Sequence, residues 1–316
     1  MTNKYNNPIV IERADPWVYK HFDGMYYFTG SVPDFQSIEI RRAKSINELG
    51  KTEEVKTIWK AHESGKLSEL IWAPELHYLK GAWYIYFAAS DDAEIRNKDR
   101  HHRMFVLENT NDDPFEGEWV EKGQITTQFE SFSIDGTVFE LKERLYYVWA
   151  QQDPRIPGNS NLYISEMENP WTLKGYQTLL SIPEYPWEKI GFKVNEGAAA
   201  LIRNDKVFIT YSASATDENY AMGLLWANID DDLLNGFSWN KEKEPVFKSS
   251  EKNQLFGPGH NSFTKSEDGK QDVLIYHARP AKNDTGDPLN NPNRHAHAQI
   301  FTWNEKGFPV FGEPGE

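Results

Sequence analysis

The stretch Ala14-Asp15-Pro16-Trp17 begins a pattern that recurs along the whole chain. Similar short segments return at intervals of 58, 62, 61 and 64 residues, and their marked positions are Asp15, Ala73, Asp135, Glu196 and His260. A nearly constant period of this size indicates repeated structural units. Five units of about 61 residues occupy roughly 305 positions. We therefore expect residues 1–316 to form a single domain.

Each unit also contains strand-like stretches at regular spacing. About eleven residues after the marked position comes a run of aromatic and β-branched residues. These runs are Met25-Tyr26-Tyr27-Phe28, Trp83 to Phe87, Leu145 to Trp149, Val207 to Tyr211 and Val273 to Tyr276. Hairpin-type turns precede four of them, at Asp23-Gly24, Lys80-Gly81, Asn204-Asp205 and Asp268-Gly269. A third strand is expected at residues 38–43, 103–108, 161–166, 223–229 and 296–303.

These patterns predict an all-β five-bladed β-propeller with a central active-site pocket. No segment shows sustained helical periodicity, and radial antiparallel sheets place the innermost strand of every blade along a central channel. A β-sandwich and a β-helix are the alternatives, although the repeat is too long for one β-helix coil. Residues 7–12 could supply a strand to the last blade.

The composition excludes several classes of function. The formal net charge is −14, with 34 Lys and Arg against 48 Asp and Glu, so nucleic acid is not expected as a partner. No run approaches the ~20 apolar residues of a membrane span. The 14% aromatic content and 11 Trp suit a neutral, polar ligand contacted by flat rings.

The cellular compartment is predicted from the start of the chain. The first residues lack the apolar core of a secretory signal. The chain contains no cysteine, so disulfides and thiol chemistry are excluded. We expect a cytoplasmic protein, unless a leader has been trimmed.

The three carboxylates at marked positions are the candidate catalytic residues. Singly, Asp15 before Pro16 and Asp135 before Gly136 would be turn formers. Together with Glu196 they are expected to face the same channel, where mutual repulsion raises at least one pKa. Two carboxyl groups with room for a water molecule are what inverting glycoside hydrolysis requires, and a third can adjust the pKa of the acid.

The five segments together resemble glycoside hydrolase family 43. The similarity rests on Arg13 to Val18, Trp72 to Leu76, Ser133 to Gly136, Asn195 to Gly197 and Gly257 to Asn261, so it covers all five units. This resemblance implies a five-bladed propeller that acts on arabinan, xylan and related side chains with inversion. In detail the chain is most similar to the exo-acting α-L-arabinofuranosidases.

The resemblance also implies roles for individual residues. Asp15 would be the general base, Asp135 the pKa modulator and Glu196 the general acid. His260 would lie at the channel floor, near a water molecule or a metal such as Ca²⁺, with no cofactor required for the chemistry. Arg279 would bind a sugar hydroxyl, or else pair with nearby acids.

Other candidate binding residues are aromatic. Trp72 could stack on a sugar or belong to the core, and Phe35 is expected in the pocket wall. Trp187 and Phe192 are expected on the leaving-group side. The pairs His101-His102 and His295/His297 lack zinc-site spacing and are expected at solvated positions.

We therefore expect a glycosidase that removes terminal L-arabinofuranose from α-1,5-linked or branched arabino-oligosaccharides. Whether the action is exo or endo depends on whether loops at residues 31–37 and 283–294 close one end of the groove. The alternatives are a β-xylosidase on the same scaffold, whose substrate places similar hydroxyls, and a non-catalytic sugar-binding propeller. The sequence does not predict the oligomeric state.

Overall fold

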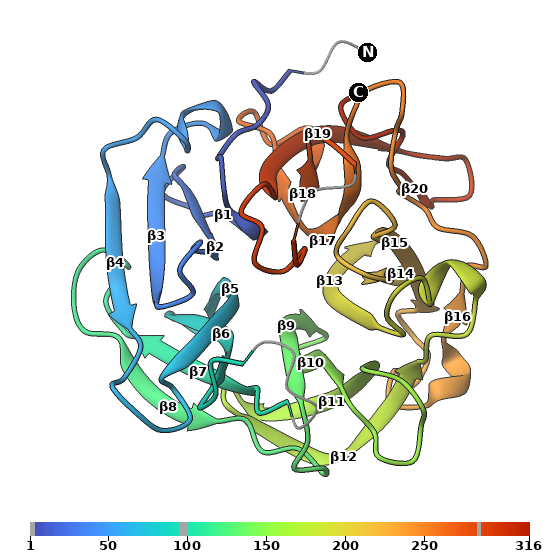
Figure 1. The fold of residues 1–316 in the computed structure, drawn as a ribbon, viewed down its shortest axis with the longest axis horizontal. Coiled ribbons are helices and arrows are strands. Elements are labelled where there is room, and N and C mark those ends of the chain that lie inside the picture. The colour runs from blue at the N-terminus through green and yellow to red at the C-terminus, as the bar shows by residue number, and fades with distance from the viewer. Residues whose placement is uncertain (1–3, 95–99, 283–285) are drawn as a thin grey trace.

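The computed structural model describes residues 4–94, 100–282 and 286–316. Its strands form five four-stranded antiparallel sheets around a central axis, which confirms the predicted propeller (Figure 1). Apart from three single turns of 3₁₀ helix, η1 (Ile46–Glu48), η2 (Pro186–Glu188) and η3 (Gly236–Ser238), the described residues contain no helix. Consequently no helix in this part of the chain could cross a membrane.

The sheets are numbered as blades 1 to 5, and each takes its strands in chain order from the axis outward (Figure 1). Blade 1 comprises β1 (Ala14–Lys20), β2 (Tyr26–Ser31), β3 (Ser37–Ala43) and β4 (Val55–Lys60). Blade 2 comprises β5 (Glu69–Leu79), β6 (Ala82–Ser90), β7 (Arg103–Asn109) and β8 (Val120–Gln124). Blade 3 comprises β9 (Ser133–Leu141), β10 (Arg144–Gln151), β11 (Asn161–Asn169) and β12 (Thr172–Ser181). Blade 4 comprises β13 (Asn195–Arg203), β14 (Lys206–Ala213), β15 (Ala221–Asn228) and β16 (Asn240–Lys241). Blade 5 comprises β17 (Phe256–Lys265), β18 (Asp272–Arg279), β19 (His295–Trp303) and β20 (Pro309–Val310).

The second and third strands of every blade lie where the sequence predicts them, but the outermost strands were not predicted. Every residue of β6 is buried, because neighbouring blades cover both faces of the sheet, and the strand therefore reads as an unbroken apolar run. By contrast, β8 has the sequence Val-Glu-Lys-Gly-Gln, with no fully buried residue. Such a strand carries no hydrophobic pattern from which it could be recognised.

Each innermost strand is interrupted near its start by an irregularity of pairing. The regular register stops after Ala14, Trp72, Ile134, Glu196 and Gly259. The next residue has a positive φ in all five blades: Asp15 (54°), Ala73 (45°), Asp135 (56°), Gly197 (58°) and His260 (44°). A bulge of this kind bends the strand and redirects its side chains.

The bulges correct the predicted alignment of the repeats. Gly197, not Glu196, is the blade 4 equivalent of Asp15 and Asp135. Glu196 occupies the preceding position, which Trp72 holds in blade 2. The acids therefore approach the axis from two different positions of the repeat.

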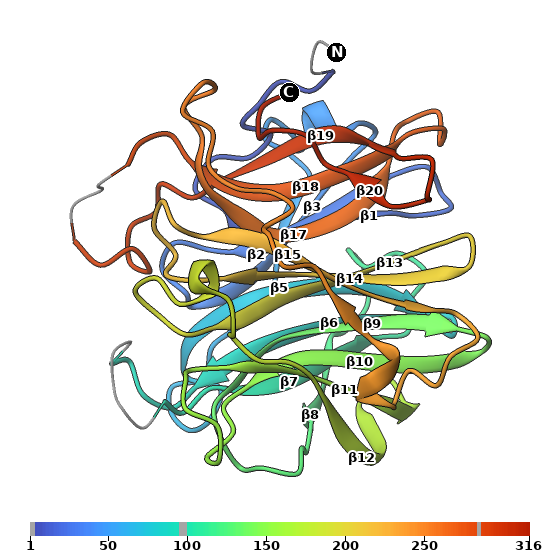
Figure 2. The ribbon, with the colours of Figure 1, turned by 90° about the vertical axis from the view of Figure 1, so that its right-hand side faces the viewer.

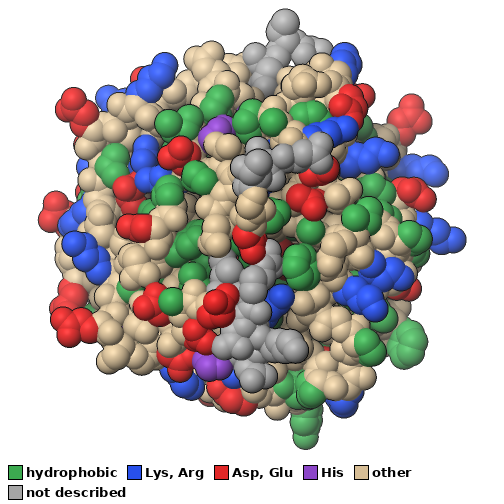
Figure 3. All heavy atoms as spheres, viewed as in Figure 1, with side chains coloured by type: hydrophobic (Ala, Val, Ile, Leu, Met, Phe, Trp, Pro, Cys, Tyr) green, Lys and Arg blue, Asp and Glu red, His purple; other side chains and the backbone are tan. Residues whose placement is uncertain are grey.

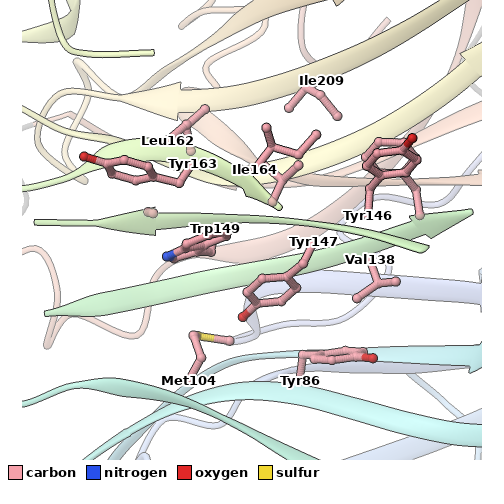
Figure 4. Close-up of a cluster of buried hydrophobic side chains, with 14 of the residues drawn as sticks. Tyr86, Met104, Val138, Tyr146, Tyr147, Trp149, Leu162, Tyr163, Ile164 and Ile209 are labelled. Carbon is pink, nitrogen blue, oxygen red and sulfur yellow. The ribbon is translucent and has the colours of Figure 1, made fainter. Parts of the chain in front are cut away.

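The hydrophobic core lies between the blades. Figure 4 shows one such cluster, in which Tyr86 and Met104 of blade 2 lie below Tyr147 and Trp149 of blade 3. Ile209 of blade 4 continues the same cluster. Because each blade buries its large side chains against the next, the innermost strands are held at defined positions around the axis.

The N-terminal segment joins blade 5, but Val10 forms an isolated bridge with Ala296 and not the strand that the sequence analysis suggested for residues 7–12. The Ile9 N–H donates to the Ala296 carbonyl and the Ala296 N–H donates to the Val10 carbonyl, both at 2.8 Å. The Asn7 amide bonds both backbone groups of Ala298, also at 2.8 Å. The described N-terminal residues and the C-terminal segment therefore both lie beside blade 5 (Figure 2).

Candidate functional site

A pocket lined by residues of all five blades lies at the end where the bulges are, and its volume, which includes space open to solvent, is about 910 Å³. Figure 3 views this face, on which acidic and basic side chains are intermixed. All three predicted carboxylates line the pocket, together with Phe35, Trp72, His102, Phe132, Ile134, Phe192, Tyr220, His260, Leu289 and Arg294 among others.

Asp15 is surrounded by donors and positive charge. Its Oδ2 accepts a hydrogen bond from Ser31 at 2.6 Å, and its Oδ1 lies 3.2 Å from His260 Nδ1 and 3.4 Å from Arg294 Nη1. Burial alone would raise the pKa of Asp15, but the charges of His260 and Arg294 outweigh it and hold the pKa well below its usual value. Asp15 is therefore a carboxylate at neutral pH.

Asp135 interacts electrostatically with both other acids. It is 4% exposed, and its Oδ2 accepts the backbone N–H of Gly197, the residue after Glu196, at 2.9 Å. The same oxygen is 4.0 Å from His260 Nδ1. Burial raises the pKa of Asp135, although the His260 charge acts against this rise.

The pKa of Glu196 is shifted in the opposite direction to that of Asp15. Burial and the negative charge of Asp135 raise the pKa of Glu196 to about 8. The Tyr220 hydroxyl donates to Glu196 Oε1 at 2.9 Å, which partly offsets the rise. Glu196 is thus mostly protonated at neutral pH.

His260 is placed at the site, as predicted, and acts as a cation. Although burial opposes protonation, the charges of Asp15 and Asp135 raise the pKa of His260 to about 10. Ca²⁺ prefers sets of oxygen ligands, whereas His260 offers a ring nitrogen. Among the residues described, no group of three His, Asp or Glu side chains could hold a metal ion.

Two residues that hold Asp15 were not anticipated from the sequence. His277 accepts the Asp15 backbone N–H at its Nδ1, 3.2 Å away, and stacks on Tyr220. Burial lowers the pKa of His277 to about 4, so the ring is neutral. Arg294 is 5% exposed and contacts Asp15 directly. Neither lies in a repeated motif, so only the contact across the fold identifies them.

Arg279 lies behind the pocket wall and is not among the lining residues. Its Nε donates to the Thr216 carbonyl at 3.1 Å and its Nη2 donates to the Pro288 carbonyl at 2.5 Å. It joins the segment that carries Thr216 and Tyr220 to the loop that carries Leu289 and Arg294. Arg294, and not Arg279, presents a guanidinium to the pocket.

The predicted aromatic residues divide between wall and core. Phe35 and Trp72 both line the pocket, with ring centroids 6.2 Å apart. Phe192 also lines it, whereas Trp187 packs on Tyr211 and donates to the Lys243 carbonyl outside it.

The predicted solvation of the paired histidines is wrong for two of them. His102 and His297 are each 4% exposed. His102 packs against Trp72 in the pocket, and His297 stacks on Tyr276 inside blade 5. Residues 283–285 of the predicted rim lie outside the described residues, but Leu289 and Arg294 of that rim line the pocket.

Comparison with known proteins identifies relatives over nearly the whole chain. A family model described as glycosyl hydrolases family 43 matches residues 5–309. A Streptomyces avermitilis protein named extracellular exo-α-(1→5)-L-arabinofuranosidase is 48% identical over 310 residues, which cover 98% of this chain and 63% of that protein. A Streptomyces chartreusis protein of the same name is 48% identical over 284 residues, covering 90% of this chain and 85% of that protein. This chain thus spans less than two thirds of the Streptomyces avermitilis relative.

A solved structure has the same fold throughout. The crystal structure of α-L-arabinofuranosidase from Lactobacillus brevis has a TM-score of 0.97 and 54% identity, with 99% of this chain and 98% of that chain covered.

The relatives correct one prediction. A cytoplasmic location is wrong, because both Streptomyces relatives are named extracellular enzymes. The prediction rested on the first residues, which lack the apolar core of a secretory signal. The family match, the identities and the shared fold lead to one conclusion: the chain belongs to glycosyl hydrolase family 43.

Proposed function

We propose that this protein is an inverting exo-acting α-L-arabinofuranosidase with residues 1–316 as its catalytic domain. The observation that carries the proposal is the opposite protonation of two carboxyl groups in one pocket. Asp15 has its pKa held well below the usual range, whereas that of Glu196 is raised to about 8. Carboxyl groups whose environments separate their pKa values in this way can serve as base and acid at the same pH.

In the proposed mechanism Asp15 removes a proton from a water molecule as that water attacks the anomeric carbon. Glu196 gives its proton to the glycosidic oxygen, which leaves with the rest of the oligosaccharide. The bond to the anomeric carbon forms on the face opposite the one that breaks, so the configuration inverts. No step uses a metal, and the Ca²⁺ near His260 stays a prediction.

The surrounding residues support the same assignment of roles. The positive charges of His260 and Arg294 keep Asp15 ionised before water attacks. Asp135 lies close enough to raise the pKa of Glu196, as expected for a modulator. When Glu196 has lost its proton, the Tyr220 hydroxyl donates to the new carboxylate.

Arabinofuranose as the sugar and exo action as the mode are supported by the relatives. The Streptomyces proteins carry both in their names, and the Lactobacillus brevis protein is named an α-L-arabinofuranosidase. Phe35, Leu289 and Arg294 add walls around the carboxylates that suit a terminal sugar.

The test is hydrolysis of α-1,5-linked arabinotriose, with aryl α-L-arabinofuranoside and aryl β-D-xylopyranoside as paired chromogenic substrates. We expect release of single arabinose units from arabinotriose, preference for the arabinofuranoside, and the inverted anomer as first product by NMR. Preference for the xylopyranoside would identify a β-xylosidase. Cleavage of neither substrate, together with a sugar-induced rise in Tm, would identify a sugar-binding protein.

A further inference from the structure

His102 is a buried histidine in the pocket wall that the proposed mechanism does not use. It precedes β7 in blade 2, and its ring stacks on Trp72 with centroids 3.9 Å apart and planes at 22°. The rings of Phe132 and His102 make a T-shaped contact, with their centroids 5.7 Å apart. The His102 backbone carbonyl accepts the Ser133 N–H at 3.0 Å, which ties this part of the wall to blade 3.

The hydrogen bond of one ring nitrogen determines the state of the other. His102 Nε2 lies 3.1 Å from the Leu70 carbonyl oxygen. A carbonyl can only accept, so Nε2 carries the hydrogen. Burial lowers the pKa of His102 to about 3, so the ring is neutral. Nδ1 therefore has a lone pair and no hydrogen, and among the described residues no hydrogen bond uses it.

We propose that His102 Nδ1 accepts a hydrogen bond from a hydroxyl group of the sugar bound in the pocket. The inference rests on the proposed glycosidase function and adds a specificity-determining residue to it. Trp72, Phe35 and Phe132 supply apolar rings beside His102, so its Nδ1 is a hydrogen-bond acceptor placed among apolar rings in the pocket lining. His102 also covers one face of Trp72, and this face cannot stack on a sugar.

The direction of the hydrogen bond has a chemical consequence. A neutral acceptor recognises a hydroxyl, but it gains nothing from a fluorine or a hydrogen at the same carbon, because these cannot donate. A site built around a hydroxyl disfavours analogues that lack it, since the acceptor is then left unpaired.

The test compares wild type with His102→Phe on an aryl α-L-arabinofuranoside and on its 2-, 3- and 5-deoxyfluoro analogues. Phenylalanine keeps the ring on Trp72 and removes the acceptor. We expect kcat/KM on the parent sugar to fall by about tenfold, which is the effect of one lost hydrogen bond. On one analogue the two enzymes should have nearly equal kcat/KM. The position of the fluorine in that analogue identifies the hydroxyl that His102 binds. The exposed His62, replaced in His62→Phe, is the matched control and should change nothing.

The inference would be overturned if the ratio of kcat/KM between wild type and His102→Phe were the same on the parent sugar and on all three analogues. A second measurement does not depend on folding of the variant. In ¹⁵N-histidine-labelled wild type, the Nδ1 signal of a neutral ring should move upfield when L-arabinose binds, and an unmoved set of histidine signals at saturation would also overturn it. Failure of wild type to cleave the parent sugar would instead contradict the proposed function.

Discussion

At the scale of single residues, the site depends on neighbouring side chains that keep one carboxyl group ionised and the other protonated. Asp15 is surrounded by Ser31, His260 and Arg294, which favour the ionised form. Glu196 is half-buried beside Asp135 and accepts a hydrogen bond from Tyr220. The same chemical group therefore has two different roles within one pocket.

Removal of either carboxyl group should abolish most turnover. In Asp15→Asn no base remains for the water, and in Glu196→Gln no proton remains for the leaving oxygen, so kcat should fall by about 100- to 10,000-fold. The measurement is arabinotriose hydrolysis. Asp205→Asn, in the exposed turn of blade 4, is the control and should keep wild-type activity. Near-normal activity of Asp15→Asn would contradict the assignment of the base.

The decline of kcat/KM at high pH should follow the ionisation of Glu196, and it should shift when Tyr220 is replaced. Because Glu196 must be protonated, kcat/KM should decline as the pH rises through about 8. The Tyr220 hydroxyl stabilises the ionised form and lowers this pKa. In Tyr220→Phe the alkaline limb should therefore move to higher pH. Tyr26→Phe is the control, because it removes a hydroxyl that donates to the Lys265 carbonyl in the interior of the fold. It should leave the alkaline limb of the pH profile in place. A shift of this limb to lower pH in Tyr220→Phe would refute the proposed effect of Tyr220 on the pKa of Glu196.

At the scale of elements, the bulge in each innermost strand is the feature that aims residues at the axis. Four of the five bulge positions with positive φ hold a non-glycine residue, although this conformation is costly for an L-residue. Backbone strain of this kind clusters at functional sites. Here Asp15, Asp135 and His260 occupy three of the four positions.

Gly197, the glycine among the five bulge positions, should tolerate no side chain. In Gly197→Ala the new Cβ would lie 3.1 Å from His260 Cγ and 3.3 Å from its Cα, at a φ of +58°. Gly24→Ala is the matched control, since Gly24 also has a positive φ (+84°) but open space around it. Both should lose about 1–2 kcal/mol in the free energy of unfolding because of φ. Only Gly197→Ala should also lower kcat, as His260 is displaced from Asp15; equal kcat values in the two variants would contradict this.

At the scale of the whole molecule, closure of the ring holds the blades around the pocket. Asp15 belongs to blade 1, and its partners His260, His277 and Arg294 belong to blade 5 or its rim. These contacts exist only while the first and last blades remain joined. The segment from Asn7 to Val10 contributes to this junction. The two blades also contact each other directly, since the Ser262 hydroxyl donates to the Pro16 carbonyl and accepts the Val18 N–H.

Weakening the junction should lower stability more than it changes the chemistry. Asn7→Ala removes two hydrogen bonds to Ala298 and should cost about 1–3 kcal/mol. By calorimetry, Tm should fall by several degrees. Asn6→Ala, at an exposed neighbouring position whose backbone N–H bonds Asn47, should leave Tm unchanged. A Tm of Asn7→Ala equal to wild type would show that the junction does not limit stability.

The sequence alone determined the period of the repeat, the buried strands and the three carboxylates that line the pocket. These features follow from local patterns, since a strand covered on both faces must be apolar and a repeated unit must recur at its own length. The outermost strands escaped prediction because they bury few of their residues and therefore lack the apolar runs of the inner strands.

Only the tertiary structure decided which residues meet. It showed that Glu196 lies one position before the bulge, that Arg294 faces the pocket while Arg279 supports its wall, and that His102 and His277 are buried there. The physical reason is that Arg294 is 279 residues from Asp15 and His277 is 262 residues from it. Contacts over such separations arise when the blades close into a ring, and no local pattern of residues records them.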